Sequence, residues 1–214
     1  MAAVVTQPDK PRGRSKSLVF SPVKEEAVAH GITVLQPERA RDEAFVEELR
    51  TYNADVIVVV AFGQLLPASI INMPRYGCIN VHASLLPKYR GASPIQWAVI
   101  DGCEYSGVTT MKMDEGLDTG DILMVEKVKL DAKETGGSLF DRLSDVGAHL
   151  LVKTLEGLEA GTITPVKQDD SESTYVKMLH KSFGKMDFNK SAAELERLIS
   201  CLLYTSPSPR DTER

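Results

Sequence analysis

The sequence has little cysteine and no long apolar run. Its 214 residues include three cysteines that are far apart and form no C-x-x-C pair. This excludes a disulfide scaffold or a cysteine zinc site and favours a reducing, cytoplasmic location. The longest apolar run, residues 56–62, is seven residues, far below the roughly 20 that a membrane span needs. The first residues also lack the basic and apolar regions of a secretory signal, so we expect no membrane attachment.

Phosphate-binding and metal-binding motifs are also missing. The sequence contains no G-x-G-x-x-G, and residues 12–16 (RGRSK) lack the Gly-Lys-Ser/Thr order of a P-loop. The loop 114–121 lacks the aspartate spacing of a calcium site, and no second histidine stands near it for zinc. Dinucleotide and NTP binding therefore have no motif behind them, and no metal is expected.

The composition, with 43% hydrophobic and 26% charged residues, is typical of a globular protein. Apolar runs and alternation predict strands over 2–6, 32–35, 55–61, 77–82, 107–113 and 122–130. Caps and helical periodicity predict helices over 22–31, 39–52, 67–73, 94–102, 138–160 and 192–203. This alternation predicts an open, mostly parallel α/β sheet with helices on both faces.

Three local patterns sharpen this prediction. Ser21-Pro22 and Ser93-Pro94 each place an N-cap residue before a proline, which favours a helix start, and Gly31 is a typical helix end. The β-branched run 55–61 (DVIVVVA) predicts a strand buried on both faces. The polar run 162–174 predicts a linker.

Polar residues at strand ends are the candidates for chemistry, because open α/β sheets bind ligands there. Asn80 and His82 are two residues apart and point to one face of their strand. Asp118 lies in the loop after the next strand, between two glycines that a tight loop with special backbone angles would need. If these strand ends are neighbours, the three side chains form a general acid–base group with an oxyanion donor. The alternative is a hydrogen-bonded core histidine.

The charge is uneven along the chain. Residues 1–24 hold five basic residues and one acidic residue, a net charge of +4, whereas the whole chain carries −5. A local basic loop can bind a polyanion even in an acidic protein. Salt limits the influence of each charge to roughly 8–10 Å, so distant acidic residues do not cancel the attraction. On charge alone, a solvated surface turn is the competing interpretation.

Three segments taken together resemble one family closely. TQPDKPRGRSKSL (6–18), GCINVHASLLPKYRGASPIQWAVIDG (77–102) and GVTTMKMDEGLDTGDIL (107–123) are similar to the methionyl-tRNA formyltransferases. The resemblance extends over residues 2–200. It implies a Rossmann-like catalytic domain that transfers a formyl group from 10-formyltetrahydrofolate to the amine of methionyl-initiator tRNA.

The resemblance also assigns site residues. It implies the catalytic trio Asn80, His82 and Asp118. It implies a folate-contacting segment made of Ser84, Leu85, Leu86 and Pro87. It implies a tRNA-binding loop with Lys10, Arg12, Arg14 and Lys16, in which Arg14 corresponds to the family's critical arginine.

The chain departs from the family at both ends. We expect residues 1–168 to form the catalytic domain without the family's first strand, and 169–184 to form a linker. Residues 185–200 then begin a C-terminal β-barrel domain, and 201–214 are a foreign tail. The complete protein is expected to be a monomer. The competing functions are another folate-dependent formyltransferase or hydrolase, acting on glycinamide ribonucleotide, a nucleotide sugar or water, and an inactive fragment.

Overall fold

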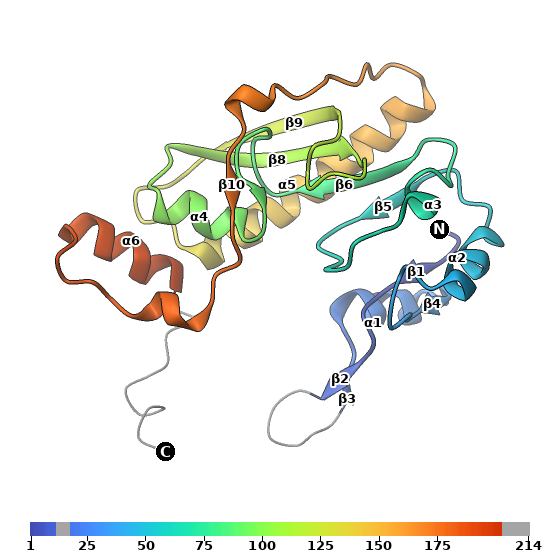
Figure 1. Cartoon of the computed structure of the whole chain (residues 1–214), viewed down its shortest axis with the longest axis horizontal. Helices are drawn as coiled ribbons and strands as arrows, with labels where there is room; N and C mark the ends of the chain where they lie inside the picture. The colour runs from blue at the N-terminus through green and yellow to red at the C-terminus, as the bar shows by residue number, and fades with distance from the viewer. Residues whose placement is uncertain (12–17, 203–214) are drawn as a thin grey trace. The chain divides into compact units, whose positions relative to one another are not determined.

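The computed structural model describes residues 1–11 and 18–202. The chain divides into two compact units, Met1–Ile79 and Asn80–Arg214, whose elements are labelled in Figure 1. The first unit contains the strands β1 (Val4–Val5), β2 (Lys10–Pro11), β3 (Leu18–Val19), β4 (Val34–Leu35) and β5 (Ile57–Val59). It also contains the helices α1 (Pro22–Ala29), α2 (Glu43–Arg50) and α3 (Ala68–Ile71).

Short strand pairs organise the first unit. β1 pairs with β4 in parallel, and β2 pairs with β3 in antiparallel. β5 adjoins the start of β6 (Cys78–His82) in the sheet order, and the backbone N–H of Ile57 donates to the Gly77 carbonyl at 3.3 Å. No other strand of the described residues pairs with β1 or with the second edge of β5. Among the described residues, the β1–β4 pair and the sheet that contains β5 are therefore separate.

Helix α1 begins and ends where the sequence predicts. The Ser21 hydroxyl oxygen accepts a hydrogen bond from the backbone N–H of Lys24 at 3.2 Å, and Pro22 occupies the first turn. Gly31 follows the helix with φ of +65°, a left-handed conformation that glycine adopts without strain.

The prediction that residues 55–61 are buried on both faces is wrong. Only Ile57–Val59 form a strand, and the side chains of Val58 and Val60 are 36% and 58% exposed. Val58 and Val60 are two residues apart and point to the same face of the chain, so the physical reason is that the described residues leave this face largely uncovered.

The second unit is built around a long hairpin. β8 (Tyr105–Lys112) and β9 (Ile122–Lys129) are antiparallel, and the remainder of β6 adjoins β8. β7 (Arg90–Gly91) pairs in parallel with β10 (Tyr175–Val176). The helices are α4 (Pro94–Ile100), α5 (Gly136–Glu159) and α6 (Ala192–Leu202), with the 3-10 turns η1 (Asp170–Glu172) and η2 (Lys181–Gly184).

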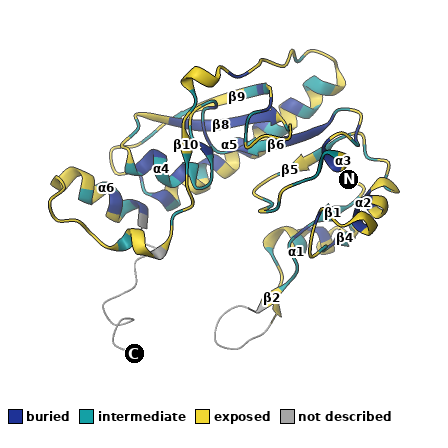
Figure 2. Ribbon diagram, in the orientation of Figure 1, coloured by how far each residue is buried: buried dark blue, intermediate teal, exposed yellow. Residues whose placement is uncertain are grey.

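Helices α4 and α5 each supply three buried residues to the core of the second unit. Leu139, Leu143 and Leu150 of α5 form one buried cluster with Val108 of β8 and Ile95 of α4. Figure 2 shows buried positions along α5 and β8. A capping box at Thr135 and Ser138 fixes the start of the helix. No helix in the described part of the chain combines the length and apolarity needed to cross a membrane.

Two predictions in the second unit need correction. Ser93 precedes α4 in a left-handed conformation with φ of +61°, and its side chain makes no capping bond among the described residues. The helix start therefore depends on Pro94 rather than on a serine cap. The polar run 162–174 is not a plain linker, because Gln168 is buried and the backbone of Val166 forms a bridge with Ile122.

Candidate functional site

The end of β6 and the loop between β8 and β9 bring the candidate trio together. Asp118 Oδ1 lies 3.4 Å from Asn80 Nδ2, which donates to it, and 3.8 Å from His82 Nδ1. The side chains of His82 and Asp118 are 8% and 12% exposed. The two strand ends are therefore adjacent, and the three polar side chains lie close together.

The ring of His82 is fixed by the backbone of Tyr89. Nε2 of His82 lies 2.9 Å from the Tyr89 carbonyl oxygen. Because a carbonyl oxygen only accepts hydrogen bonds, Nε2 must carry a proton. Nδ1, on the side of Asp118, is therefore the nitrogen that can take up or release a proton.

Asp118 is held by its carboxylate and by its main chain. Its Oδ2 accepts a hydrogen bond from the backbone N–H of Gly91 at 2.8 Å. Its own φ is +55°, so Asp118 itself adopts the left-handed conformation that the sequence assigned to the neighbouring glycines. Gly120 serves a different need, since a Cβ there would collide with the carbonyl oxygen of Lys112.

The side chain of Tyr89 has hydrogen-bond partners of its own, separate from the contact of its carbonyl oxygen with His82. Its hydroxyl donates to Asp101 Oδ2 at 2.9 Å and lies 3.0 Å from Cys103 Sγ. Burial raises the pKa of this hydroxyl above its usual value, so it keeps its proton. The backbone of Tyr89 has φ of +59°, a conformation that a non-glycine residue keeps only when its surroundings impose it.

The predicted folate segment forms a tight turn after β6. Ser84 and Leu86 are buried, and the Ser84 hydroxyl donates to the Lys88 carbonyl at 2.7 Å. The backbone N–H of Leu86 donates to Thr109 Oγ1 at 3.2 Å. Leu85 lies over Gly107 of β8, where a Cβ would meet its side chain at 2.6 Å. Leu85 and Pro87 are only partly buried, so they are the side chains of this segment that can contact a ligand.

The basic loop is described only at its base. Lys10 is exposed and lies in β2, opposite Val19 of β3. Arg12, Arg14 and Lys16 lie outside the described residues. Lys24, the fifth basic residue of this region, forms an ion pair with Asp9 and also donates to Gln36.

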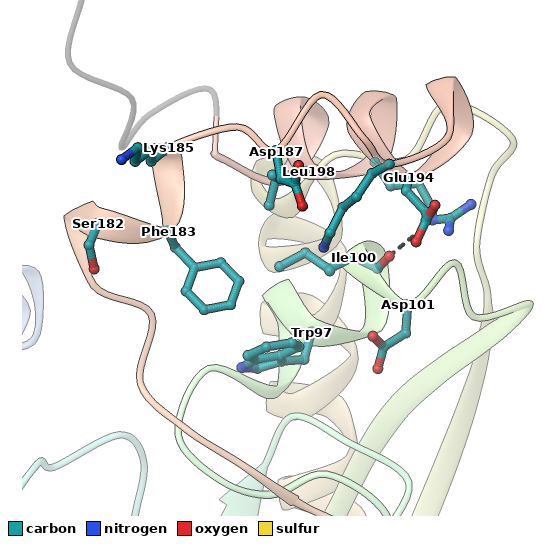
Figure 3. Close-up of a pocket in the computed structure, with 11 residues that line it drawn as sticks. Trp97, Ile100, Asp101, Ser182, Phe183, Lys185, Asp187, Glu194 and Leu198 are labelled. Atoms are coloured by element: carbon teal, nitrogen blue, oxygen red, sulfur yellow. Dashed lines mark hydrogen bonds between the residues drawn. The ribbon is translucent and has the colours of Figure 1, made fainter.

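A cleft of about 620 Å³ lies elsewhere in the second unit, between α4, η2 and α6 (Figure 3). The rings of Trp97 and Phe183 meet edge to face at 5.3 Å along its apolar wall. Its charged rim is mixed and comprises Asp101, Lys185, Asp187, Lys190, Glu194 and Arg197. The cleft includes no member of the trio or of the folate segment.

Sequence reasoning left several supporting residues unassigned. Arg90 is 1% exposed, and its guanidinium binds the side chain of Gln168, 78 positions later. Arg90 lies inside the segment 77–102 that carries the family resemblance but was given no role there, and Gln168 shows no periodic or motif signal. Within the described residues, no three His, Cys, Asp or Glu side chains gather as a metal site would require.

Comparison with known proteins places this geometry in context. The methionyl-tRNA formyltransferase of Lachnospira eligens is 99% identical over 199 residues, which is 93% of this chain and 63% of that protein. The methionyl-tRNA formyltransferase of Agathobacter rectalis is 59% identical and covers 93% of this chain and 64% of its own length. The chain therefore spans somewhat less than two thirds of these relatives.

A solved structure agrees with the fold. WlaRD, a sugar 3N-formyl transferase crystallised in the presence of dTDP and 5-N-formyl-THF, superposes with a TM-score of 0.70 at 20% identity. The match covers 98% of this chain and 73% of that one. The family model described as formyl transferase matches residues 1–155. On this evidence, the chain belongs to the formyl transferase family.

Proposed function

We propose that this chain transfers a formyl group from 10-formyltetrahydrofolate to the amino group of methionyl-initiator tRNA. The observation that carries the proposal is the convergence of Asn80, His82 and Asp118 at 3.4 and 3.8 Å, in a family whose members transfer formyl groups. The acceptor follows from the two named relatives, both of which are methionyl-tRNA formyltransferases.

The reaction needs an oxyanion donor and a route for one proton. The neutral amine attacks the formyl carbon, and negative charge develops on the formyl oxygen. Asn80 has a second amide hydrogen beyond the one aimed at Asp118, and His82 can donate from Nδ1 when protonated. Collapse of the intermediate breaks the bond from the formyl carbon to N10 of the folate, and the amine proton passes to that nitrogen. Asp118 orients both donors throughout.

The remaining assignments follow the same scheme. Ser84, Leu85, Leu86 and Pro87 form the folate-contacting turn, with Leu85 and Pro87 providing the accessible side chains. WlaRD was crystallised in the presence of a formylated folate, which supports a folate donor here. Lys10, Arg12, Arg14 and Lys16 contact the phosphates of the tRNA, as clustered basic residues do. The three free thiols suit a cytoplasmic protein, which we propose to act as a monomer.

Single-turnover transfer with labelled formyl donor and charged initiator tRNA tests the proposal. We expect the chain to formylate the methionyl amine, and Asn80→Ala or Asp118→Ala to reduce the rate by about 10²–10³ while folate binding persists. His149→Ala is the control substitution and should leave the rate unchanged, because His149 is an exposed histidine on α5, outside the trio.

The choice of acceptor separates the competing functions. Transfer to a sugar amine, to glycinamide ribonucleotide or to water, with none to methionyl-tRNA, would favour the other formyltransferases and hydrolases. Absence of transfer to every acceptor would favour an inactive fragment. Full turnover by Asn80→Ala or Asp118→Ala would contradict the assignment of the trio.

A further inference from the structure

Gln168 holds the left-handed backbone of Asp118 through its carbonyl oxygen. The side-chain amide of Gln168 donates to the carbonyl oxygen of Asp118 at 2.9 Å and to that of Gly120 at 2.7 Å. Gln168 is 6% exposed. A left-handed non-glycine residue persists only where its surroundings over-determine it. These two bonds fix the main chain at Asp118 and at Gly120, two residues further on.

Arg90 determines which way the Gln168 amide faces. Nε and Nη2 of Arg90 donate to Oε1 of Gln168 at 3.0 and 2.8 Å. A guanidinium group only donates, so it requires the amide oxygen on its own side and directs the NH₂ group to the Asp118 loop. Burial lowers the pKa of Arg90, but hydrogen bonds to Tyr175 and Asp170 outweigh it and raise that pKa, so the group keeps its charge.

The segment that carries Gln168 also leads into a strand that pairs with β7, next to Asp118. This strand is β10, which Figure 1 labels. The backbone N–H groups of Arg90 and Ala92 donate to the carbonyl oxygens of Thr174 and Val176 at 2.8 and 3.0 Å. Between them, the N–H of Gly91 donates to Asp118 Oδ2 at 2.8 Å. The N–H groups of Arg90 and Ala92 therefore indicate whether β7 and β10 stay paired, and the N–H of Gly91 indicates whether the Asp118 carboxylate stays in place.

We propose that Arg90 and Gln168 are positioning residues for Asp118, which they orient toward Asn80 and His82 through the main chain of residues 118–120. The expected effect on the rate of formyl transfer rests on the proposed function. The expected effect on the position of Asp118 does not depend on it. Neither residue touches a reacting atom. Their effect passes through the carbonyl oxygens that fix the left-handed turn.

Gln168→Glu is the most selective test. Glutamate keeps an acceptor for Arg90, but it replaces the two N–H donors by an oxygen that faces two carbonyl oxygens. We expect the amide of Gly91 to exchange with solvent about tenfold faster, because its bond to Asp118 opens more often. The amides of Arg90 and Ala92 should keep their protection. In single-turnover assays the rate constant should fall about 10- to 100-fold, with the half-saturating folate concentration within about twofold.

Gln168→Met and Gln96→Glu complete the set. Methionine keeps the length of the side chain without its hydrogen bonds, and it should give the same selective loss at Gly91. Gln168→Met therefore decides the inference if Gln168→Glu fails to fold. Gln96→Glu makes the same chemical change as Gln168→Glu on α4, at a partly buried position outside the trio and its support, and should leave all three amides unchanged.

The possible outcomes separate this inference from the proposed function. Unchanged protection at Gly91, or equal loss at Arg90, Gly91 and Ala92, would overturn the positioning role and leave only a general structural one. The amide measurement uses no substrate. It therefore decides this inference even if the chain transfers no formyl group, in which case the proposed function alone fails.

Discussion

The two units bury their apolar residues to different extents. In the second unit, six consecutive residues of β8 are buried, from Ser106 to Met111. In the first unit, β5 has three residues, and Val58 and Val60 on this β-branched run are 36% and 58% exposed. Strand β8 has a neighbouring strand on each side and a 24-residue helix against it, whereas β5 has an open edge among the described strands.

The difference teaches where precise chemistry can be supported. The whole trio lies in the second unit, and so do Tyr89, Arg90 and Gln168, which hold it. Catalytic geometry tolerates little looseness, so it benefits from neighbours that are themselves packed. The described base of the basic loop, by contrast, lies in the first unit, where Lys10 pairs opposite Val19.

The largest expected effect comes from removing a core leucine of the second unit. Leu139 is fully buried, so Leu139→Ala should lower the free energy of unfolding by about 2–5 kcal/mol. Leu65, in the first unit, is 86% exposed, and Leu65→Ala should change it by less than about 0.5 kcal/mol. Denaturant unfolding followed by the fluorescence of Trp97 measures the first variant, and circular dichroism measures both. Equal effects would remove the contrast between the units.

An isosteric pair sharpens the same comparison with a smaller effect. Val108→Thr buries a hydroxyl at a position that is 1% exposed, which should cost about 1–3 kcal/mol. Val60→Thr makes the same change at a half-exposed position and should stay within about 0.5 kcal/mol. Thermal unfolding by circular dichroism compares them. A cost at Val60 as large as that at Val108 would show that the run 57–60 is covered in solution.

The smallest effect concerns acid stability of the first unit. Hydrogen bonds from Lys24 and Gln36 lower the pKa of Asp9 from its usual 3.8. A lowered folded-state pKa contributes stability above the unfolded value, and that contribution is lost as the pH falls through the folded value. Asp9→Asn should therefore be less stable than the parent at pH 6, with a difference that shrinks below about pH 4. Melting temperatures over this range test it, with the exposed Asp55→Asn as control; a constant difference would contradict the pairing.

Local signals in the sequence were enough for much of the fold. Ser21 and Gly31 mark α1, and the leucine stripe marks α5, because caps and periodicity act over a few residues. The same holds for Asn80 and His82, whose spacing on a strand places them on one face. The approach of Asp118 to them needed only that two strand ends meet.

The supporting residues could not be found in this way. Gln168 lies in a polar run without periodicity, and its burial depends on Arg90 at a distance of 78 positions. The left-handed turn at Asp118 is likewise held by a bond from Gln168, 50 positions later, which no local pattern predicts. The exposure of Val60 could not be predicted either. A β-branched run carries no information about whether residues far away in the sequence will cover it.

Strand β6 carries the boundary between the units in its middle. Cys78 and Ile79 are counted with the first unit, and Asn80 to His82 with the second. A fragment cut at that boundary would begin at Asn80, whose side-chain amide we propose as the oxyanion donor, and would place a new charged terminus beside it. Any attempt to divide the molecule for separate study must therefore keep the intact strand on the catalytic side.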